Sequence, residues 1–131
     1  MDIQVSSTVL EAVLEEARNY LPDECCGILL GEGNRIVRLV PARNVHSNPK
    51  THFEIDPQAL IDAHRAARSG GPQIAGYYHS HPDGPPEPSA TDRDMAAGDG
   101  MIWLIAGRGK VRAWRSLPHG FEPLSLRIKD V

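Results

Sequence analysis

The spacing of apolar residues predicts a helix near the start of the chain. Between residues 8 and 22, apolar side chains recur every three or four positions, which is the period of one helix face. These positions are Val9, Leu10, Val13, Leu14 and Ala17. Thr8 and Glu11 have the spacing of a capping box at the first turn. Pro22 is expected to end this helix, because proline cannot donate the backbone hydrogen bond that a helix interior needs.

A second helix is predicted over residues 56–71. Asp56 suits the N-cap, Pro57 suits the first helical position, and Gly70 with Gly71 follows the last turn. The residues expected on its apolar face are Leu60, Ile61, His64 and Ala67. A third, short helix is expected from about Ser89 to Ala97.

Short apolar or alternating runs between these helices predict strands. The expected strands cover residues 25–31, 35–45, 52–56, 73–78, 101–107, 110–116 and 121–128. The sequence Gly-Arg-Gly at 107–109 indicates a hairpin between two of them. Strands and helices are mixed without a regular βαβ alternation, so an α+β or three-layer α/β domain with a mixed sheet is expected. We expect residues 1–131 to form a single domain.

Composition narrows the class of protein. The chain has 131 residues, of which 40% are hydrophobic and 24% charged, close to the average for globular proteins. The net charge is -3, and the basic residues are scattered, so nucleic acid is not an expected partner. No apolar run approaches membrane-spanning length, so a membrane is not expected either. The acidic N-terminal segment does not resemble a signal peptide. A cytoplasmic location is expected. Cys25 and Cys26 also favour it, because two adjacent cysteines cannot form a disulfide framework that links distant segments.

The segment HSHPDGPPEPSATD, residues 79–92, carries the candidate chemistry. On an extended backbone His79 and His81 point to the same side, as two ligands of one metal ion would. A proline-rich and therefore stiff loop can return Asp92 to them as a third ligand. Catalytic zinc usually has three protein ligands and keeps its fourth position for water. A general base is then needed, and Glu24, at the start of the first predicted strand, is our candidate.

Ser89 and Asp92 also fit a simpler interpretation. Ser-x-x-Asp is a capping box, and Thr91 with Asp94 has the same spacing. The two interpretations are compatible, because a metal ligand in the first turn of a helix can also cap it.

Two segments together resemble the JAMM family of metalloproteases, also called MPN+ or Mov34/PAD-1. These are DECCGILLG, at 23–31, and GYYHSHPDGPPEPSATDRD, at 76–94. The resemblance implies a single cytidine-deaminase-like, three-layer MPN domain, with one zinc ion bound by His79, His81 and Asp92. It further implies that Glu24 transfers protons and that the Ser89 hydroxyl stabilises the oxyanion.

The resemblance also implies an activity. Members of this family hydrolyse amide or isopeptide bonds at the C-terminal tail of ubiquitin-like proteins, and this short chain is similar to the compact prokaryotic members. The expected substrate is therefore a ubiquitin-like or sulfur-carrier protein that ends in Gly-Gly. Two alternatives stay open: a non-catalytic MPN-type scaffold, and a zinc hydrolase of an unrelated small amide or peptide. A zinc deaminase is disfavoured, because its P-C-x-x-C motif is absent from the sequence.

Other reactive residues have simpler explanations. Cys25 and Cys26 are expected to be small buried hydrophobic residues rather than nucleophiles. Trp103 and Trp114 are expected to pack in or on the sheet. The residues expected to have structural or solvated roles are Asp83, Glu87, His46, His52, His64 and His119.

Overall fold

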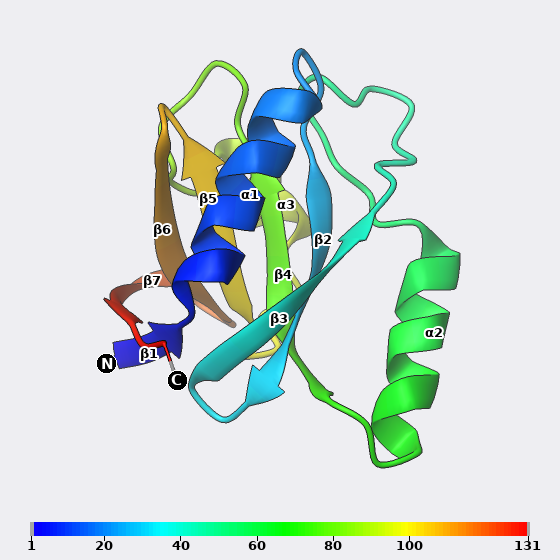
Figure 1. Cartoon of the computed structure of the whole chain (residues 1–131). Helices are drawn as coiled ribbons and strands as arrows, with labels where there is room; N and C mark the ends of the chain where they lie inside the picture. Colours follow the sequence, from blue (N-terminus) through cyan, green and yellow to red (C-terminus); the bar gives the residue numbers. More distant parts are fainter. Residues whose placement is uncertain (1, 131) are drawn as a thin grey trace.

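The chain folds into a strongly curved, mixed β-sheet with helices on both faces (Figure 1). The computed structural model describes residues 2–130. Within this range the strands are β1 (Asp2–Val5), β2 (Cys26–Glu32), β3 (Arg35–Ala42), β4 (Gln73–Ser80), β5 (Ile102–Gly107), β6 (Lys110–Leu117) and β7 (Gly120–Ile128). Their order is β1-β3-β2-β4-β5-β6-β7, and β1 closes the sheet because it pairs with both β3 and β7. The predicted α+β class with a mixed sheet is confirmed, whereas its closure was not predicted.

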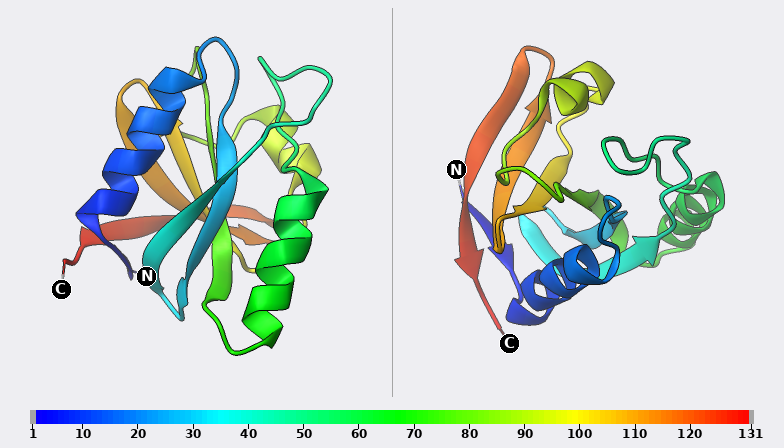
Figure 2. Two further views of the ribbon diagram at one scale, coloured as in Figure 1. Left: turned by 45° about the vertical axis from the view of Figure 1, so that its right-hand side comes forward. Right: turned by 90° about the horizontal axis from the view of Figure 1, so that it is seen from above.

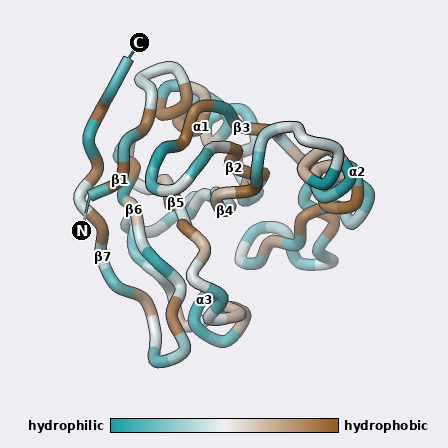
Figure 3. Tube along the Cα trace, turned by 90° about the horizontal axis from the view of Figure 1, so that it is seen from below, coloured by the Kyte–Doolittle hydropathy of each residue, from teal (hydrophilic) through white to brown (hydrophobic). Residues whose placement is uncertain are grey.

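Helix α1 (Ser7–Asn19) lies on one face of the sheet, and α2 (Pro57–Arg68) lies on the other (Figure 2). The short helix α3 (Ala90–Met95) follows the proline-rich loop. Hydrophobic residues gather where α1 meets β2 and β3 (Figure 3). Within the described part of the chain, none of the helices has the length and apolar character that crossing a membrane requires.

The alternation of side chains in β2 divides the core in two. Cys25 packs with Val9 and Val13 on the α1 side. Its neighbour Cys26 packs with Ile28 on the α2 side. Both thiols are fully buried, so the prediction that these cysteines are core residues is confirmed.

The ends of α1 differ from those predicted. The N-cap is Ser6, whose hydroxyl accepts a hydrogen bond from the Val9 N–H at 3.3 Å. The Thr8 hydroxyl instead contacts the Ser6 hydroxyl at 3.1 Å, so the proposed Thr8–Glu11 capping box is wrong. The helix ends at Asn19, before Pro22 is reached.

Two strand predictions and one helix face also need correction. Residues 52–56 form no strand, because they lie in the loop between β3 and α2, in which Asn44 and Ile55 form an isolated bridge. The short strand β1 was missed, because four residues are too few to show a period. On α2 the expected face is partly wrong: Ile61 is 44% exposed and His64 is exposed. Leu60 packs on the core as predicted, together with Ala59 and Ala63.

Candidate metal centre

The end of β4 presents two histidines on one face. His79 lies within the strand and His81 immediately follows it, and residues two apart on an extended chain share a face. His79 pairs with Cys26 of β2. The Ser80 N–H donates to the Cys25 carbonyl at 3.2 Å, which extends this pairing past the end of β2. Beyond this pairing, Glu24 and His81 lie close enough for the charge of each to shift the pKa of the other.

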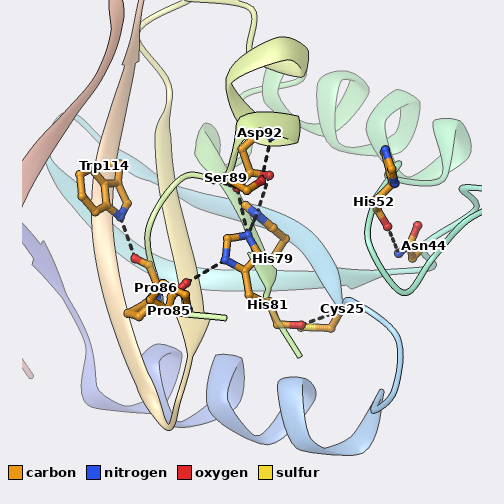
Figure 4. A network of polar contacts seen from close by, with 11 residues as sticks. Cys25, Asn44, His52, His79, His81, Pro85, Pro86, Ser89, Asp92 and Trp114 are labelled. Carbon is orange, nitrogen blue, oxygen red and sulfur yellow. Dashed lines mark hydrogen bonds and ion pairs between the residues drawn. The ribbon is translucent and has the colours of Figure 1, made fainter. Parts of the chain in front are cut away.

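Helix α3 brings a carboxylate to the two imidazoles (Figure 4). The Nε2 atom of His79 lies 3.0 Å from Oδ1 of Asp92, and the Nε2 atom of His81 lies 3.0 Å from Oδ2. The two Nε2 atoms are themselves 3.2 Å apart. The three predicted ligands therefore converge, although Asp92 is 11 residues beyond His81.

This geometry fits a small divalent cation. Two ligands of a tetrahedral zinc ion, each about 2.0 Å from the metal, are about 3.3 Å apart. The His81 Nδ1–H donates to the Pro85 carbonyl at 2.8 Å, which leaves the lone pair of Nε2 for a metal. One cation would satisfy both facing Nε2 atoms and the carboxylate together. His79, His81 and Asp92 thus form a group that can hold a metal ion.

The local electrostatics favour the protonation state that a metal ligand needs at Asp92 and at His79, but not at His81. Burial opposes ionisation of Asp92, but hydrogen bonds with His79 and His81 outweigh it and hold the pKa of this carboxyl well below its usual range. Complete burial lowers the pKa of His79. For His81, hydrogen bonds with Asp92 and Pro85 outweigh burial, so its pKa is raised. The carboxylate is therefore ionised and the buried imidazole neutral.

The proline-rich loop is fixed at two points. The His81 imidazole binds the Pro85 carbonyl, and the indole N–H of Trp114, on β6, donates to the Pro86 carbonyl at 3.1 Å (Figure 4). The loop then enters α3 through a capping box. The Ser89 hydroxyl accepts from the Asp92 N–H, and Asp92 Oδ2 accepts from the Ser89 N–H, both at 3.0 Å. The capping interpretation is confirmed for this pair, and it places Asp92 toward the histidines.

Glu24 is a buried acid beside this group. Only 5% of it is exposed, and its Oε1 has no hydrogen-bond partner among the described residues. Burial raises the pKa of Glu24 to about 7, and the charge of Asp92 adds to this effect while that of His81 opposes it. A carboxyl that exchanges protons near neutral pH, next to a candidate metal site, has the properties of a general base.

Three supporting contacts were not recognised from the sequence. The hydroxyl of Ser80, between the two histidines, accepts from the Cys25 N–H at 2.9 Å and so ties the segment of Glu24 to β4. Phe53 stacks on the His79 ring with centroids 4.3 Å apart, and Trp103 meets that ring edge-on at 5.4 Å. His79 Nδ1 has no hydrogen-bond partner among the described residues, so aromatic packing and the contact of Nε2 with Asp92 hold this ring. No local motif in the sequence signals any of these contacts.

Among the described residues, the other candidate groups do not belong to the group of three ligands. Burial raises the pKa of Cys25 to about 11 and that of Cys26 to about 12, so neither is an activated thiol. His46 and His52 stack on each other in the loop before α2. His119 contacts Glu122 at the surface at 3.2 Å.

Comparison with known proteins connects this geometry to a family. The family model described as prokaryotic homologues of the JAB domain matches residues 6–117. A desampylase of Haloferax volcanii is 33% identical, over 93% of this chain and 90% of that protein. A probable TtuB-protein conjugate cleaving protease of Thermus thermophilus is 37% identical, over 87% and 78%. A CysO-cysteine peptidase of Mycobacterium tuberculosis is 31% identical, over 96% and 82%.

Comparison with solved structures supports the same fold. The solution structure of a protein of Desulfitobacterium hafniense superposes with a TM-score of 0.85 at 28% identity, over 98% of this chain and 94% of that one. The structure described as a JAMM metalloprotease-like zinc site superposes with a TM-score of 0.64 at 18% identity, over 99% and 100%, which supports the expected MPN fold. The chain belongs to the prokaryotic JAB-domain family, the compact prokaryotic form of the JAMM/MPN+ metalloproteases.

Proposed function

We propose that this protein is a zinc-dependent peptidase or isopeptidase that hydrolyses an amide bond at the C-terminal Gly-Gly tail of a ubiquitin-like or sulfur-carrier protein. The observation that carries the proposal is the convergence of His79, His81 and Asp92 beside the buried carboxyl of Glu24. The names of the relatives, a desampylase, a conjugate-cleaving protease and a CysO-cysteine peptidase, support the substrate class. In this proposal residues 1–131 form one domain with one zinc ion.

Each residue of the site has its own role in the proposed reaction. Zinc, when bound by the two histidines and Asp92, supplies a Lewis acid that polarises a carbonyl and makes water acidic near neutral pH. Glu24 takes a proton from the attacking water and delivers it to the leaving nitrogen as the C–N bond breaks. The Ser89 hydroxyl uses a lone pair to accept from the Asp92 N–H, so its own hydrogen is free to donate to the developing oxyanion.

A panel of conjugates tests this function. Ubiquitin-fold carriers that end in Gly-Gly, each joined by an amide bond to cysteine or to a lysine side chain, are incubated with the zinc-loaded protein and followed by intact mass. We expect release of a carrier with its Gly-Gly intact, and no release by Glu24→Gln, which keeps its zinc. A folded, zinc-loaded protein that cleaves none of the conjugates contradicts the proposal. Tight binding without cleavage would favour the scaffold alternative.

A further inference from the structure

The loop of residues 43–55 holds the backbone of Glu24 from one side. Glu24 precedes β2, so the hydrogen bonds within that strand do not fix it. Its N–H donates to the Pro49 carbonyl at 2.8 Å. Its carbonyl accepts from Nδ2 of Asn44 at 3.0 Å. Both partners belong to the same loop, which connects β3 with α2.

The Asn44 side chain also organises this loop. Its Nδ2 donates a second hydrogen bond to the His52 carbonyl at 2.9 Å (Figure 4). Its Oδ1 accepts from the N–H groups of His46 and Glu54, both at 3.1 Å. Both amide donors and both acceptor positions of the side chain are therefore used. A surface asparagine rarely has all of its donors and acceptor positions in use. Four hydrogen bonds that converge on one side-chain amide define one loop conformation.

We propose that Asn44 is a positioning residue for Glu24, an inference that rests on the proposed function. The direction of the Glu24 carboxyl follows from its backbone, which is held at its N–H by Pro49 and at its carbonyl by Asn44. On the β4 side, Ser80 holds the next N–H, that of Cys25. Removing the Asn44 donors frees the Glu24 carbonyl and lets the carboxyl move relative to the scissile bond.

The metal ligands lie on other elements, so this role separates from metal binding. His79 and His81 are at the end of β4, and Asp92 is in α3. A change at Asn44 would disturb these ligands only if the whole loop of residues 43–55 collapsed, because Phe53 of that loop stacks on His79. A positioning role therefore predicts a loss of turnover with zinc affinity retained. A purely structural role predicts that both fall together.

Two variants of Asn44 and one control test the proposal. Asn44→Ala removes the donors and the acceptor, whereas Asn44→Asp keeps an oxygen for the His46 and Glu54 N–H groups and loses the donors. Asn48→Ala is the control, because it alters an exposed asparagine of the same loop. The measurements are zinc affinity, kcat and KM on a cleaved conjugate, and hydrogen exchange of the Glu24 and Glu54 amides in the zinc-loaded protein.

For both Asn44 variants we expect kcat to fall about 10-fold to 100-fold, the scale of a misplacement of about 1 Å, with KM and zinc affinity within about threefold of wild type. The Glu24 amide should exchange faster in both, while the Glu54 amide stays protected in Asn44→Asp and loses protection in Asn44→Ala. Asn48→Ala should match wild type throughout.

Wild-type kcat in Asn44→Ala overturns the proposal, as does a parallel loss of zinc affinity. An unchanged hydrogen-exchange rate of the Glu24 amide in the Asn44 variants also overturns the proposal, and this measurement needs no known substrate. If no conjugate is cleaved by the wild type, the proposed function fails, and the exchange measurement still decides whether Asn44 holds Glu24.

Discussion

Replacing Glu24 by glutamine should stabilise the metal-free protein, and only at neutral and alkaline pH. Glu24 is 5% exposed, and its Oε1 has no hydrogen-bond partner among the described residues. Its charged form is therefore costly in the folded state. Glutamine is similar in shape to the protonated acid but cannot ionise. A residue kept for catalysis at the expense of stability is common in active sites.

The magnitude follows from the raised pKa. Below pH 4.5 the carboxyl is protonated in both states and contributes no penalty. As the pH rises toward 7 the unfolded chain releases the proton while the folded chain keeps it, so the wild type loses stability. The pKa rise from 4.5 to about 7 corresponds to roughly 3 kcal/mol, because a tenfold change in proton affinity equals about 1.4 kcal/mol. The advantage of Glu24→Gln should be roughly 3 kcal/mol at pH 8 and under about 1 kcal/mol at pH 5.

Urea unfolding in the presence of a chelator measures this difference. Wild type, Glu24→Gln and the control Glu32→Gln, at the exposed end of β2, are compared at pH 5 and pH 8. The control should follow the wild type at both values. An equal stability difference between Glu24→Gln and wild type at the two pH values would refute the reasoning, since it would mean that Glu24 ionises normally in the folded protein.

Other contacts of the site make separate predictions. Ser89→Ala removes the acceptor for the Asp92 N–H. It should lower the free energy of unfolding by about 1 kcal/mol and should lower kcat by about 10²-fold to 10³-fold. A loss of stability with normal kcat would leave Ser89 only its capping role. Trp114→Phe removes the donor to the Pro86 carbonyl and should lower the free energy of unfolding by about 1 kcal/mol in urea; no change would mean that this bond does not hold the loop. Cys25 and Cys26, whose pKa values burial raises to about 11 and about 12, should resist iodoacetamide at pH 8 until the protein unfolds, and rapid alkylation of the native protein would show that these thiols are accessible.

The candidate ligands were predictable because local rules place them. Two histidines separated by one residue share a face on any extended strand, and Ser-x-x-Asp sets both the start of α3 and the direction of Asp92. The large helices were predictable for the same reason, since Asp56 and Pro57 mark the start of α2 in the sequence.

The remaining features depend on contacts between distant segments. The pairing that brings Glu24 near His81 joins Cys25 with Ser80, more than fifty positions apart. Residues 52–56 have the composition of a strand, but the Asn44 side chain takes the Glu54 N–H, so they form a loop. Closure of the sheet by β1 depends on β7, at the far end of the chain. No periodicity in the sequence contains this information.

Anomalous diffraction at the zinc edge, from crystals of the zinc-loaded protein, tests the central claim most directly. We expect one peak per chain, about 2.0–2.2 Å from Nε2 of His79, Nε2 of His81 and one carboxylate oxygen of Asp92, with the Glu24 carboxyl outside the coordination sphere. A peak elsewhere, no peak in a folded and zinc-loaded protein, or direct coordination by Glu24 would contradict it.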